Sequence, residues 1–340
     1  MMSLANRFKP KENFVMKNMK MVDAIREALR EEMLHDEDVF LLGEALGGVQ
    51  GGSFRVTKGL DEEFGKARVV DTAISEAAIG GVAVGAAAYG MRPVVEIMFG
   101  SLMPLVADEI HNQAGTLHYV SGGKINCPCV IRTCNWMRII SGPHHCGNID
   151  ALWVNSPGIK AVAPSTPYDA KGLLKTAIRD NDPVIFLEYS PLYTKTGDVP
   201  EEEYFVPIGK ADIKREGKDV TIICYATTVG DALESAELME KEGVSVEVLD
   251  LRTIIPYDKE AIRASVEKTG RVVIAYEGYK TGGVGSEIAA FIAEECIDSL
   301  IAPVLRVACK DVPNPSNSIL IENISIGKRE VIDAIRRVME

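Results

Sequence analysis

Short apolar runs alternate with helix-like stretches along the first 190 residues of the chain. The stretch Met21–Glu32 places apolar residues three and four positions apart, which predicts a helix that is buried along one face. Further helices are predicted at Ser101–Tyr119 and Ala170–Ile178. The strand-like runs are Val39–Leu42, Val94–Ile97, Pro128–Thr133, Ile159–Ala163 and Val184–Leu187. This alternation predicts an α/β domain with a parallel sheet covered by helices on both faces.

A second alternating series begins near residue 218. Before it, residues 191–217 contain three prolines, three glycines and the acidic run Glu201–Glu203, which is typical of a linker. Beyond it, strands are predicted to begin at residues 220, 246, 271 and 303, and helices are predicted at 229–241, 258–268, 284–297 and 329–338. We therefore predict a two-domain α/β chain, with domains at 15–190 and 218–340.

Composition narrows the classes of function. The 340 residues carry a net charge of -12 and show no basic stripe, which argues against a nucleic-acid partner. Seven scattered cysteines predict reduced thiols in an intracellular protein, and the Cys127–Cys129 pair lacks a second pair at zinc-site spacing. No apolar stretch approaches the roughly 18 residues of a membrane span, and the opening residues lack the apolar segment of a signal peptide. We expect a soluble, cytoplasmic protein.

The run RVVDTAISEAAIGGVAVGAAAYGMRPVVEIMF, Arg68–Phe99, contains the first candidate for chemistry, Glu76. This carboxylate lies between a strand-like entry and a helix of small residues that another backbone can approach closely, as at a protein interface. Two interpretations are open from the residues alone. Glu76 is either a helix-terminal carboxylate stabilised by the helix dipole or a group with a chemical role.

The second candidate is the segment SGPHHCGNIDALWVNSPGIK, Ser141–Lys160. Adjacent histidines, His144 and His145, lie in a loop flanked by glycine and proline, where a core-filling role is excluded. Histidine suits proton transfer because its ordinary pKa lies near neutrality. A solvent-exposed pair without a role is the alternative. The glycine-rich runs at Gly47 and Gly282 do not complete a dinucleotide-binding fingerprint and are interpreted as turns.

Several motifs resemble the β chain of thiamine-diphosphate-dependent 2-oxo acid dehydrogenases. They are DTAISE, RPVVEIMF, GGSFRVTKGL and PSTPYDAKGLLKTAIRDNDPVIFLE, and the resemblance covers nearly the whole chain. It implies a transketolase-like pyrimidine-binding domain followed by a transketolase C-terminal-like domain. It also implies that Glu76 hydrogen-bonds the cofactor's pyrimidine ring and that His145 acts near the substrate carbonyl. Met98 and Leu102 match positions that line the pyrimidine, although apolar residues there are also compatible with a core role.

The resemblance further implies ions and partners. Cys129, Ala177, Ile178, Asp180 and Asp182 match backbone carbonyls that hold a structural potassium ion in some relatives. The chain contains no Gly-Asp-Gly with a downstream asparagine for magnesium and diphosphate, a motif that the family places on a separate α subunit. The implied assembly is therefore an α2β2 heterotetramer with β–β self-association, which transfers its acyl product to the lipoyl group of a dihydrolipoamide acyltransferase.

The chain departs from the family around its histidines. The usual Gln-His-Ser-Gln followed by Glu-Ala is replaced by His144, His145, Cys146 and Gly147, then Asp150-Ala151, and Leu102 stands where an aromatic residue often packs. Pyruvate and branched-chain 2-oxo acids are the expected substrates, and an acetoin dehydrogenase β subunit is the alternative. A non-catalytic scaffold subunit would be indicated by loss of Glu76, which is present. A self-sufficient transketolase-like enzyme is disfavoured because the diphosphate motif is missing.

Overall fold

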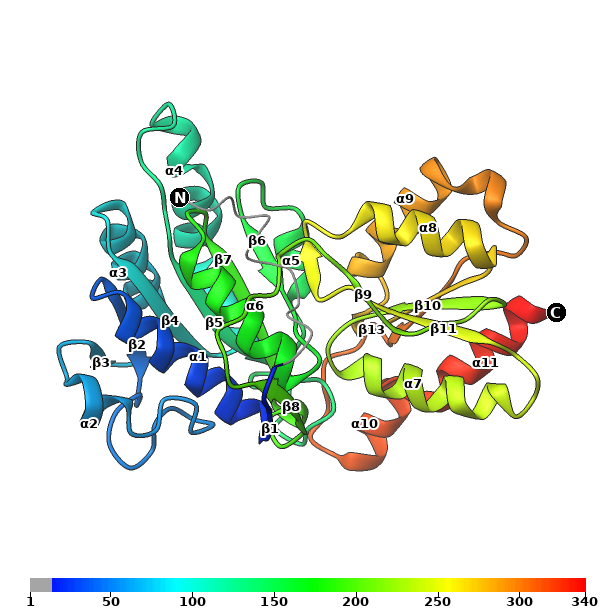
Figure 1. Ribbon diagram of the computed structural model, residues 1–340, viewed down its shortest axis with the longest axis horizontal. Coiled ribbons are helices and arrows are strands. Elements are labelled where there is room, and N and C mark those ends of the chain that lie inside the picture. The colour runs from blue at the N-terminus through cyan, green and yellow to red at the C-terminus, as the bar shows by residue number, and fades with distance from the viewer. Residues whose placement is uncertain (1–13) are drawn as a thin grey trace. The chain divides into compact units, whose positions relative to one another are not determined.

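The computed structural model describes residues 14–340, and contacts between its residues divide the chain into two compact units. The N-terminal unit runs to residue 135 and resumes at 155–208, whereas the C-terminal unit contains 136–154 and 209–340. Figure 1 shows a sheet flanked by helices in each unit. The short segment Trp136–Val154 thus interrupts the N-terminal unit in sequence but packs with the C-terminal one.

The N-terminal unit is built on six parallel strands, which pair in the order β3-β2-β4-β5-β7-β6. They are β2 (Val39–Glu44), β3 (Val69–Thr72), β4 (Arg92–Phe99), β5 (Val130–Asn135), β6 (Lys160–Val162) and β7 (Val184–Tyr189). Every residue of β2, β5 and β7 is buried, as in a parallel sheet that is covered on both faces. A separate antiparallel pair joins β1 (Met16–Lys20) to β8 (Thr196–Pro200).

The helices of this unit are α1 (Met21–His35), α2 (Leu60–Phe64), α3 (Glu76–Ala88), α4 (Gly115–Val120) and α6 (Pro167–Arg179). The helical stretch predicted over Ser101–Tyr119 is helical throughout, but it is not one regular α-helix. The chain instead forms a 3-10 helix at Gly100–Val106, a π-helix at Glu109–Ala114 and then α4. Pro104 lies inside the first of these and has no amide hydrogen to donate, so a continuous α-helix is disfavoured there.

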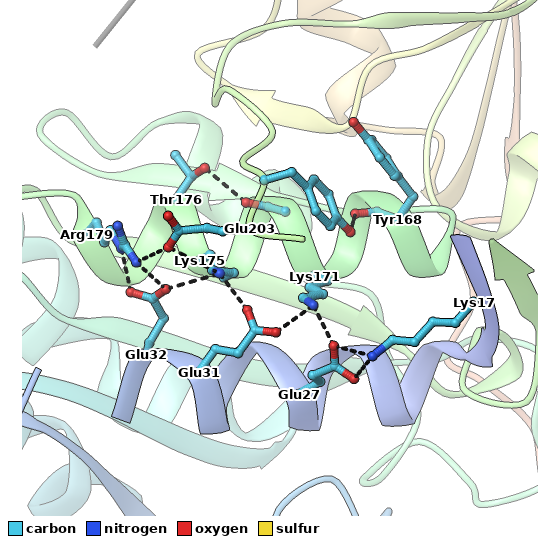
Figure 2. A network of polar contacts seen from close by, with 12 residues as sticks. Lys17, Glu27, Glu31, Glu32, Tyr168, Lys171, Lys175, Thr176, Arg179 and Glu203 are labelled. Atoms are coloured by element: carbon cyan, nitrogen blue, oxygen red, sulfur yellow. Dashed lines mark hydrogen bonds and ion pairs between the residues drawn. The ribbon is translucent and has the colours of Figure 1, made fainter. Parts of the chain in front are cut away.

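Charged side chains join α1 to α6, as Figure 2 shows. We call this set the helix network; its cations are Lys17, Lys171, Lys175 and Arg179, and its carboxylates are Glu27, Glu31, Glu32 and Glu203. Lys171 Nζ lies 2.5 Å from Glu27 Oε1 and 2.7 Å from Glu31 Oε1, and its side chain is fully buried. Arg179 Nε lies 2.7 Å from Glu32 Oε2. The periodicity of three and four on both helices brings these charges to one seam.

The C-terminal unit has a five-stranded sheet in the order β14-β13-β10-β11-β9, in which only β9 is antiparallel to its neighbour. The strands of this unit are β9 (Asp212–Arg215), β10 (Val220–Cys224), β11 (Val246–Asp250), β12 (Thr253–Ile255), β13 (Val272–Tyr279) and β14 (Leu305–Cys309). The helices are α5 (Asp150–Val154), α7 (Thr227–Glu240), α8 (Lys259–Thr269), α9 (Val284–Glu295), α10 (Ser318–Ile324) and α11 (Lys328–Met339).

Helices cover both faces of this second sheet (Figure 1). A hydrophobic core packs α7 and α11 against β10, β11 and β13, while α8 and α9 lie on the opposite face. The amphipathic pattern predicted at 329–338 is confirmed by α11, whose buried residues recur every three or four positions. Among residues 14–340, none of the helices has both the length and the apolar character that a membrane span requires.

Candidate active site

The carboxyl ends of the parallel strands in the N-terminal unit form the candidate site. From β2 the chain proceeds to β3 on one side of it and then, through α3, to β4 on the other side. The strand order therefore reverses at β2, and open α/β sheets bind ligands at such reversal points, beyond the carboxyl ends of the strands. Glu44 is the last residue of β2, and Glu76 is the first residue of α3.

Glu76 is buried although it begins a helix, with 8% of its surface exposed. Its position on the first turn of α3 favours a negative charge because the helix dipole is positive at that end. The helix itself approaches the segment 100–114 closely at Gly80. A Cβ atom added there would lie 3.2 Å from Glu109 Cβ and 3.3 Å from Val106 Cβ. The small residues of α3 thus fix the helix, and with it Glu76, against the rest of the unit.

Glu44 is a neighbour of Glu76 that the sequence analysis did not identify. Burial raises the pKa of the Glu44 carboxyl above its ordinary value, and the negative charge of Glu76 raises it further. The two carboxyls therefore interact across the end of the sheet. A glutamate that ends a fully apolar strand is the sequence signal that could have pointed to it.

A second charged group lies within the sheet, and we call it the sheet cluster: Glu96 on β4, Arg132 on β5, Glu188 on β7, and Tyr193. Arg132 binds Glu188 in a bidentate manner, with Nε 2.6 Å from Oε1 and Nη2 2.9 Å from Oε2, and its Nη1 lies 2.8 Å from Glu96 Oε2. The Tyr193 hydroxyl donates to Glu188 Oε2 over 2.5 Å. All four residues are buried, so the cluster is almost dry.

Two carboxylates share one guanidinium in this cluster. Burial raises the pKa of Glu96; the positive charge of Arg132 opposes this shift, and the negative charge of Glu188 adds to it. For Arg132, burial acts to lower the pKa, but the charges of Glu188 and Glu96 outweigh burial and raise it. Charged residues inside otherwise apolar strands were the available signal for this cluster. Their partners depend on strand order, which the sequence analysis did not predict.

Met98 and Leu102, the two predicted cofactor-lining residues, are both half-buried. Met98 lies near the end of β4, and Leu102 lies in the 3-10 helix Gly100–Val106 that follows it. Both elements pack against α3, the helix that begins with Glu76. Close by in the fold, at the end of β3, the buried Thr72 Oγ1 has no hydrogen-bond partner within the described part of the chain.

His144 and His145 lie in the C-terminal unit, on the segment Trp136–Val154. Both are exposed, and they lie in a tight turn in which the amides of His145 and Cys146 donate to the Gly142 carbonyl. The His145 carbonyl accepts a hydrogen bond from Trp136 Nε1. The structure thus brings Glu44 and Glu76 together in one unit and describes His145 in the other.

The five residues predicted to hold potassium surround the bend between α6 and β7. The carbonyls of Ile178 and Asp180 accept hydrogen bonds from Arg92 Nη1, over 3.0 and 2.9 Å. The Cys129 and Ala177 carbonyls accept the amides of Val184 and Asp180. Lys160 Nζ lies 2.7 Å from Asp180 Oδ2 and 3.0 Å from Asp182 Oδ2. Cationic side chains therefore already hold this bend, although each carbonyl retains a second lone pair.

Comparison with known families matches both halves of the chain. Residues 17–195 match the pyrimidine binding domain of transketolase, and residues 209–331 match the transketolase C-terminal domain. A solved structure described as a split gene transketolase, inactive β4 tetramer, superposes with a TM-score of 0.77 at 24% identity, over 94% of this chain and 98% of that one. This structural likeness concerns the fold.

Curated relatives match almost from end to end. The pyruvate dehydrogenase E1 component subunit beta of Staphylococcus epidermidis is 46% identical over 96% of this chain and 100% of its own length. The Bacillus subtilis protein of that name is 45% identical over the same shares. The 2-oxoisovalerate dehydrogenase subunit beta of Bacillus subtilis is 44% identical over 94% of this chain and 98% of its own length.

Proposed function

The chain belongs to the family of E1 β subunits of pyruvate and branched-chain 2-oxo acid dehydrogenases, and from this premise we propose that it catalyses the oxidative decarboxylation of such an acid together with an α subunit. Relatives named for pyruvate and for 2-oxoisovalerate match at 46% and 44% identity, so the comparisons favour neither substrate. We further propose that the acyl product passes to the lipoyl group of a dihydrolipoamide acyltransferase. The departures around His145 leave acetoin cleavage as the alternative activity.

The buried Glu76 at the strand-order reversal carries the proposal. The family depends on thiamine diphosphate, whose thiazolium ring, when bound, supplies the carbon nucleophile for a 2-oxo acid. The residues present fit its pyrimidine ring. Glu76 offers a buried carboxylate for a ring nitrogen, the half-buried Met98 and Leu102 offer apolar contacts, and Thr72 Oγ1 is a buried hydroxyl without a partner among residues 14–340.

The chain's own groups then have distinct roles. Glu76 holds a proton or a hydrogen bond at the pyrimidine, and the buried Glu44 beside it keeps that edge of the sheet rich in negative charge. His145, exposed on its loop, acts on protons near the substrate carbonyl. Burial around Glu76 excludes water, which strengthens the electrostatic contacts of its carboxylate.

Replacing Glu76 with glutamine tests this role. The shapes match, so folding should be preserved, while hydrogen-deuterium exchange at the thiazolium carbon of bound cofactor should slow by several orders of magnitude. Turnover should also fall, by most of the factor of about 10²–10⁴ that a positioned acid or base usually contributes. Glu109→Gln is the matched control, because Glu109 is half-buried on the segment that packs against α3 but does not begin it. Exchange at the parental rate would show that Glu76 is a helix-terminal carboxylate without a role in proton transfer.

His145→Ala compared with His144→Ala tests the second role. We expect the first change to lower turnover of the reconstituted complex by about a hundredfold or more and the second to cost much less. Cofactor binding is measured separately, so that a loss of affinity is not taken for a loss of catalysis. Equal, small effects would show that neither histidine transfers protons. The same complex, assayed on pyruvate, branched-chain 2-oxo acids and acetoin, decides the substrate.

The α subunit is proposed because the chain lacks the motif that holds magnesium and diphosphate. We expect the isolated chain to bind thiamine diphosphate weakly or not at all, and calorimetry with and without magnesium measures this. Micromolar, magnesium-dependent binding by the chain alone would contradict the two-chain enzyme.

Self-association of β subunits is proposed from the exposed face of α3. That face carries only small or apolar residues, namely Ala77, Ala78, Gly81, Val82, Gly85, Ala88 and Tyr89. Small residues permit close packing of a second helix, so Val82→Glu should dissociate the assembly in light scattering. The exposed Val49→Glu on a loop is the control. An unchanged mass for Val82→Glu would contradict an interface on α3.

Potassium is proposed to use the free lone pairs of the carbonyls of Cys129, Ala177, Ile178, Asp180 and Asp182, beside Arg92. Replacing potassium by choline in the buffer should lower the melting temperature if the ion binds. We also propose a cytoplasmic location, supported by seven cysteines that are all free and buried. Cell fractionation tests that location.

A further inference from the structure

The segment Trp136–Val154 fills the point where strand order reverses in the C-terminal sheet. From β10 the chain proceeds to β11 on one side and later to β13 on the other, so the reversal lies at the carboxyl ends of β10 and β13. In an open α/β sheet this is the usual place for a ligand. Here the chain's own residues take that place, and they carry the exposed His144 and His145 at their tip.

Glu277 on β13 is one anchor of the segment. Its side chain is buried and accepts the Met137 amide at 2.9 Å and the Thr227 hydroxyl at 2.5 Å. Arg138 Nε lies 3.3 Å from Glu277 Oε2, and the Asn148 side-chain amide donates to the Glu277 carbonyl. One residue therefore holds both arms of the histidine turn.

Asp150 is the second anchor and comes from the segment itself. It is 1% exposed, and Tyr225, equally buried at the end of β10, donates its hydroxyl to Asp150 Oδ2. The Asp150 amide donates to Asn148 Oδ1 over 3.0 Å, which couples this carboxylate to the arm held by Glu277. The Tyr225 ring is stacked on Tyr276, with ring centroids 6.5 Å apart, so the donor itself is held in place.

Further contacts hold the other arm and leave the tip open. Arg138 Nη2 lies 2.7 Å from Asp231 Oδ2 on α7, and the Asn314 side-chain amide donates to the Ile139 carbonyl over 3.1 Å. Cys146 is buried and its thiol donates to the same carbonyl. Between these contacts only the turn with the two histidines is exposed, so its conformation depends on how the arms are held.

We propose that Asp150 is a positioning residue, whose ionised carboxylate accepts the Tyr225 hydroxyl and thereby sets the conformation in which His145 acts. The assignment rests on the proposed function as far as the role of His145 is concerned. The hydrogen bond between Asp150 and Tyr225 is present whatever the role of His145. Asp150 touches neither histidine, so it acts through the arms of the turn.

This anchor makes the segment sensitive to pH. Burial raises the pKa of Asp150 to about 6; hydrogen bonds from Tyr225, the Ala151 amide and Asn148 oppose burial, and the charge of Glu277 adds to it. The titratable groups that act on Asp150 or its partners come from four elements: Tyr225 after β10, Tyr276 and Glu277 on β13, Cys309 on β14 and Arg138 on the segment. Removing the Tyr225 hydroxyl withdraws a bond to the charged form, so it should shift the titration to higher pH.

Tryptophan fluorescence of the isolated chain measures the segment without any assay of activity. The chain has two tryptophans, and both lie on this segment: Trp153 is fully buried, and Trp136 donates its indole hydrogen to the His145 carbonyl. We expect a one-proton fluorescence transition near pH 6 in the parent. It should move to higher pH in Tyr225→Phe and disappear in Asp150→Asn. Tyr276→Phe is the control, because its hydroxyl faces the Lys280 carbonyl and its loss should leave the transition in place.

The reconstituted complex then measures the consequence for the reaction. Asp150→Asn should lower kcat by about tenfold to a hundredfold with KM nearly unchanged, which is the size expected when a catalytic group is misplaced by about 1 Å. Asp150→Glu, which keeps the carboxylate, should recover part of this loss.

Two outcomes would overturn the inference, and they differ from each other. A fluorescence transition that persists in Asp150→Asn overturns the anchor and leaves the proposed function intact. A transition that disappears as expected, with kcat unchanged at every pH, shows that the anchor exists but does not position a catalytic group, which overturns the positioning role; the proposed role of His145 is decided separately by the His145→Ala comparison.

Discussion

The sheet cluster, which is buried, and the helix network, which is partly exposed, are both charge arrays of the N-terminal unit, yet their charges are balanced differently. The helix network sets four cations against four carboxylates on α1, α6 and their neighbours (Figure 2). At the sheet, Arg132 is the one cation of the described residues that pairs with Glu96 and Glu188, and Glu44 and Glu76 lie at the same edge. The balanced array joins helices, whereas the acid-rich one lies where the fold places a ligand.

The pKa shifts follow the same division. Burial acts to raise the pKa of Glu27 in the helix network, but hydrogen bonds from Lys17 and Lys171 outweigh burial and lower it. In Glu96 and Glu44, burial wins and the pKa is raised. A carboxylate with two cations is thus kept ionised, while carboxyls that share one cation or none hold protons more readily. Charge balance separates a structural array from one suited to proton transfer.

Among the substitutions that test this comparison, the removal of Arg132 should cause the largest loss in the free energy of unfolding. Arg132→Gln leaves Glu96 and Glu188 buried with no cation among their contacts, and breaking a buried pair in this way costs about 3–5 kcal/mol. Urea denaturation at pH 7.5 measures the free energy of unfolding. Arg132→Lys is the control, since it keeps the charge and loses the bidentate geometry, and it should be intermediate. A loss below that of the network variant described next would contradict the distinction between the arrays.

Lys171→Met should cost less, although Lys171 is equally buried. Glu27 keeps Lys17 at 2.6 Å, Glu31 keeps Lys175 at 2.5 Å, and both carboxylates are about a quarter exposed. We expect a loss of about 1.5–3 kcal/mol, the range for hydrogen bonds to charged groups, with kcat of the complex unchanged. The exposed Lys20→Met is the control. A fall in kcat would show that the network reaches the site.

Acid should weaken the helix network through Glu27. Because the pKa of Glu27 is lowered in the folded state, its stabilisation is present above the ordinary value of 4.5 and is lost as pH falls through the folded value. Lys17→Met should therefore cost about 0.2–1 kcal/mol at pH 7, and the difference from the parent should shrink below pH 4.5. Denaturation curves between pH 3.5 and 7 measure it. A difference that grows on acidification would reverse the assigned direction.

Glu44→Gln should have the smallest effect and the opposite sign. The raised pKa of Glu44 means that its ionised form is disfavoured by folding, so its contribution to stability is lost as pH rises through the folded value. The glutamine variant should be more stable than the parent at pH 8, by less than about 0.5 kcal/mol, and equal to it near pH 4. Paired thermal scans at the two pH values compare them. A variant that is less stable than the parent at pH 8 would show that the ionised Glu44 stabilises the folded state, as the carboxylates of the helix network do.

Most of the fold could be predicted from the sequence because its elements are long and periodic. The strands predicted at 39–42, 94–97, 128–133 and 184–187 and the helices predicted at 21–32 and 170–178 all have the right type. Among the missed strands, β1, β8 and β9 have mixed exposure, so no apolar run marks them. Local periodicity predicts which face of an element is buried, but it does not predict which other element packs against that face.

The site was predictable only in part for the same reason. Glu76 was identified because an acid between a strand and a small-residue helix is locally unusual. Arg132 and Glu188 are 56 residues apart and meet because β5 and β7 are neighbours in the sheet. Asp150 was noted only as a departure from a motif, since its partner Tyr225 lies 75 residues away. Strand order, which follows from the whole chain, decides each of these contacts.

The packing of Trp136–Val154 with the C-terminal unit constrains how the chain can fold during synthesis. The hydrogen bond of the Met137 amide cannot form until Glu277 has left the ribosome, 140 residues later, and the hydrogen bond of Asn148 depends on the same residue. Contacts of such separation form late because the loop between them must close first. While the chain is being synthesised, the N-terminal unit therefore folds with the segment Trp136–Val154 not yet packed against the C-terminal unit. A gene split between residues 208 and 209 would give a C-terminal fragment without the segment that fills its sheet.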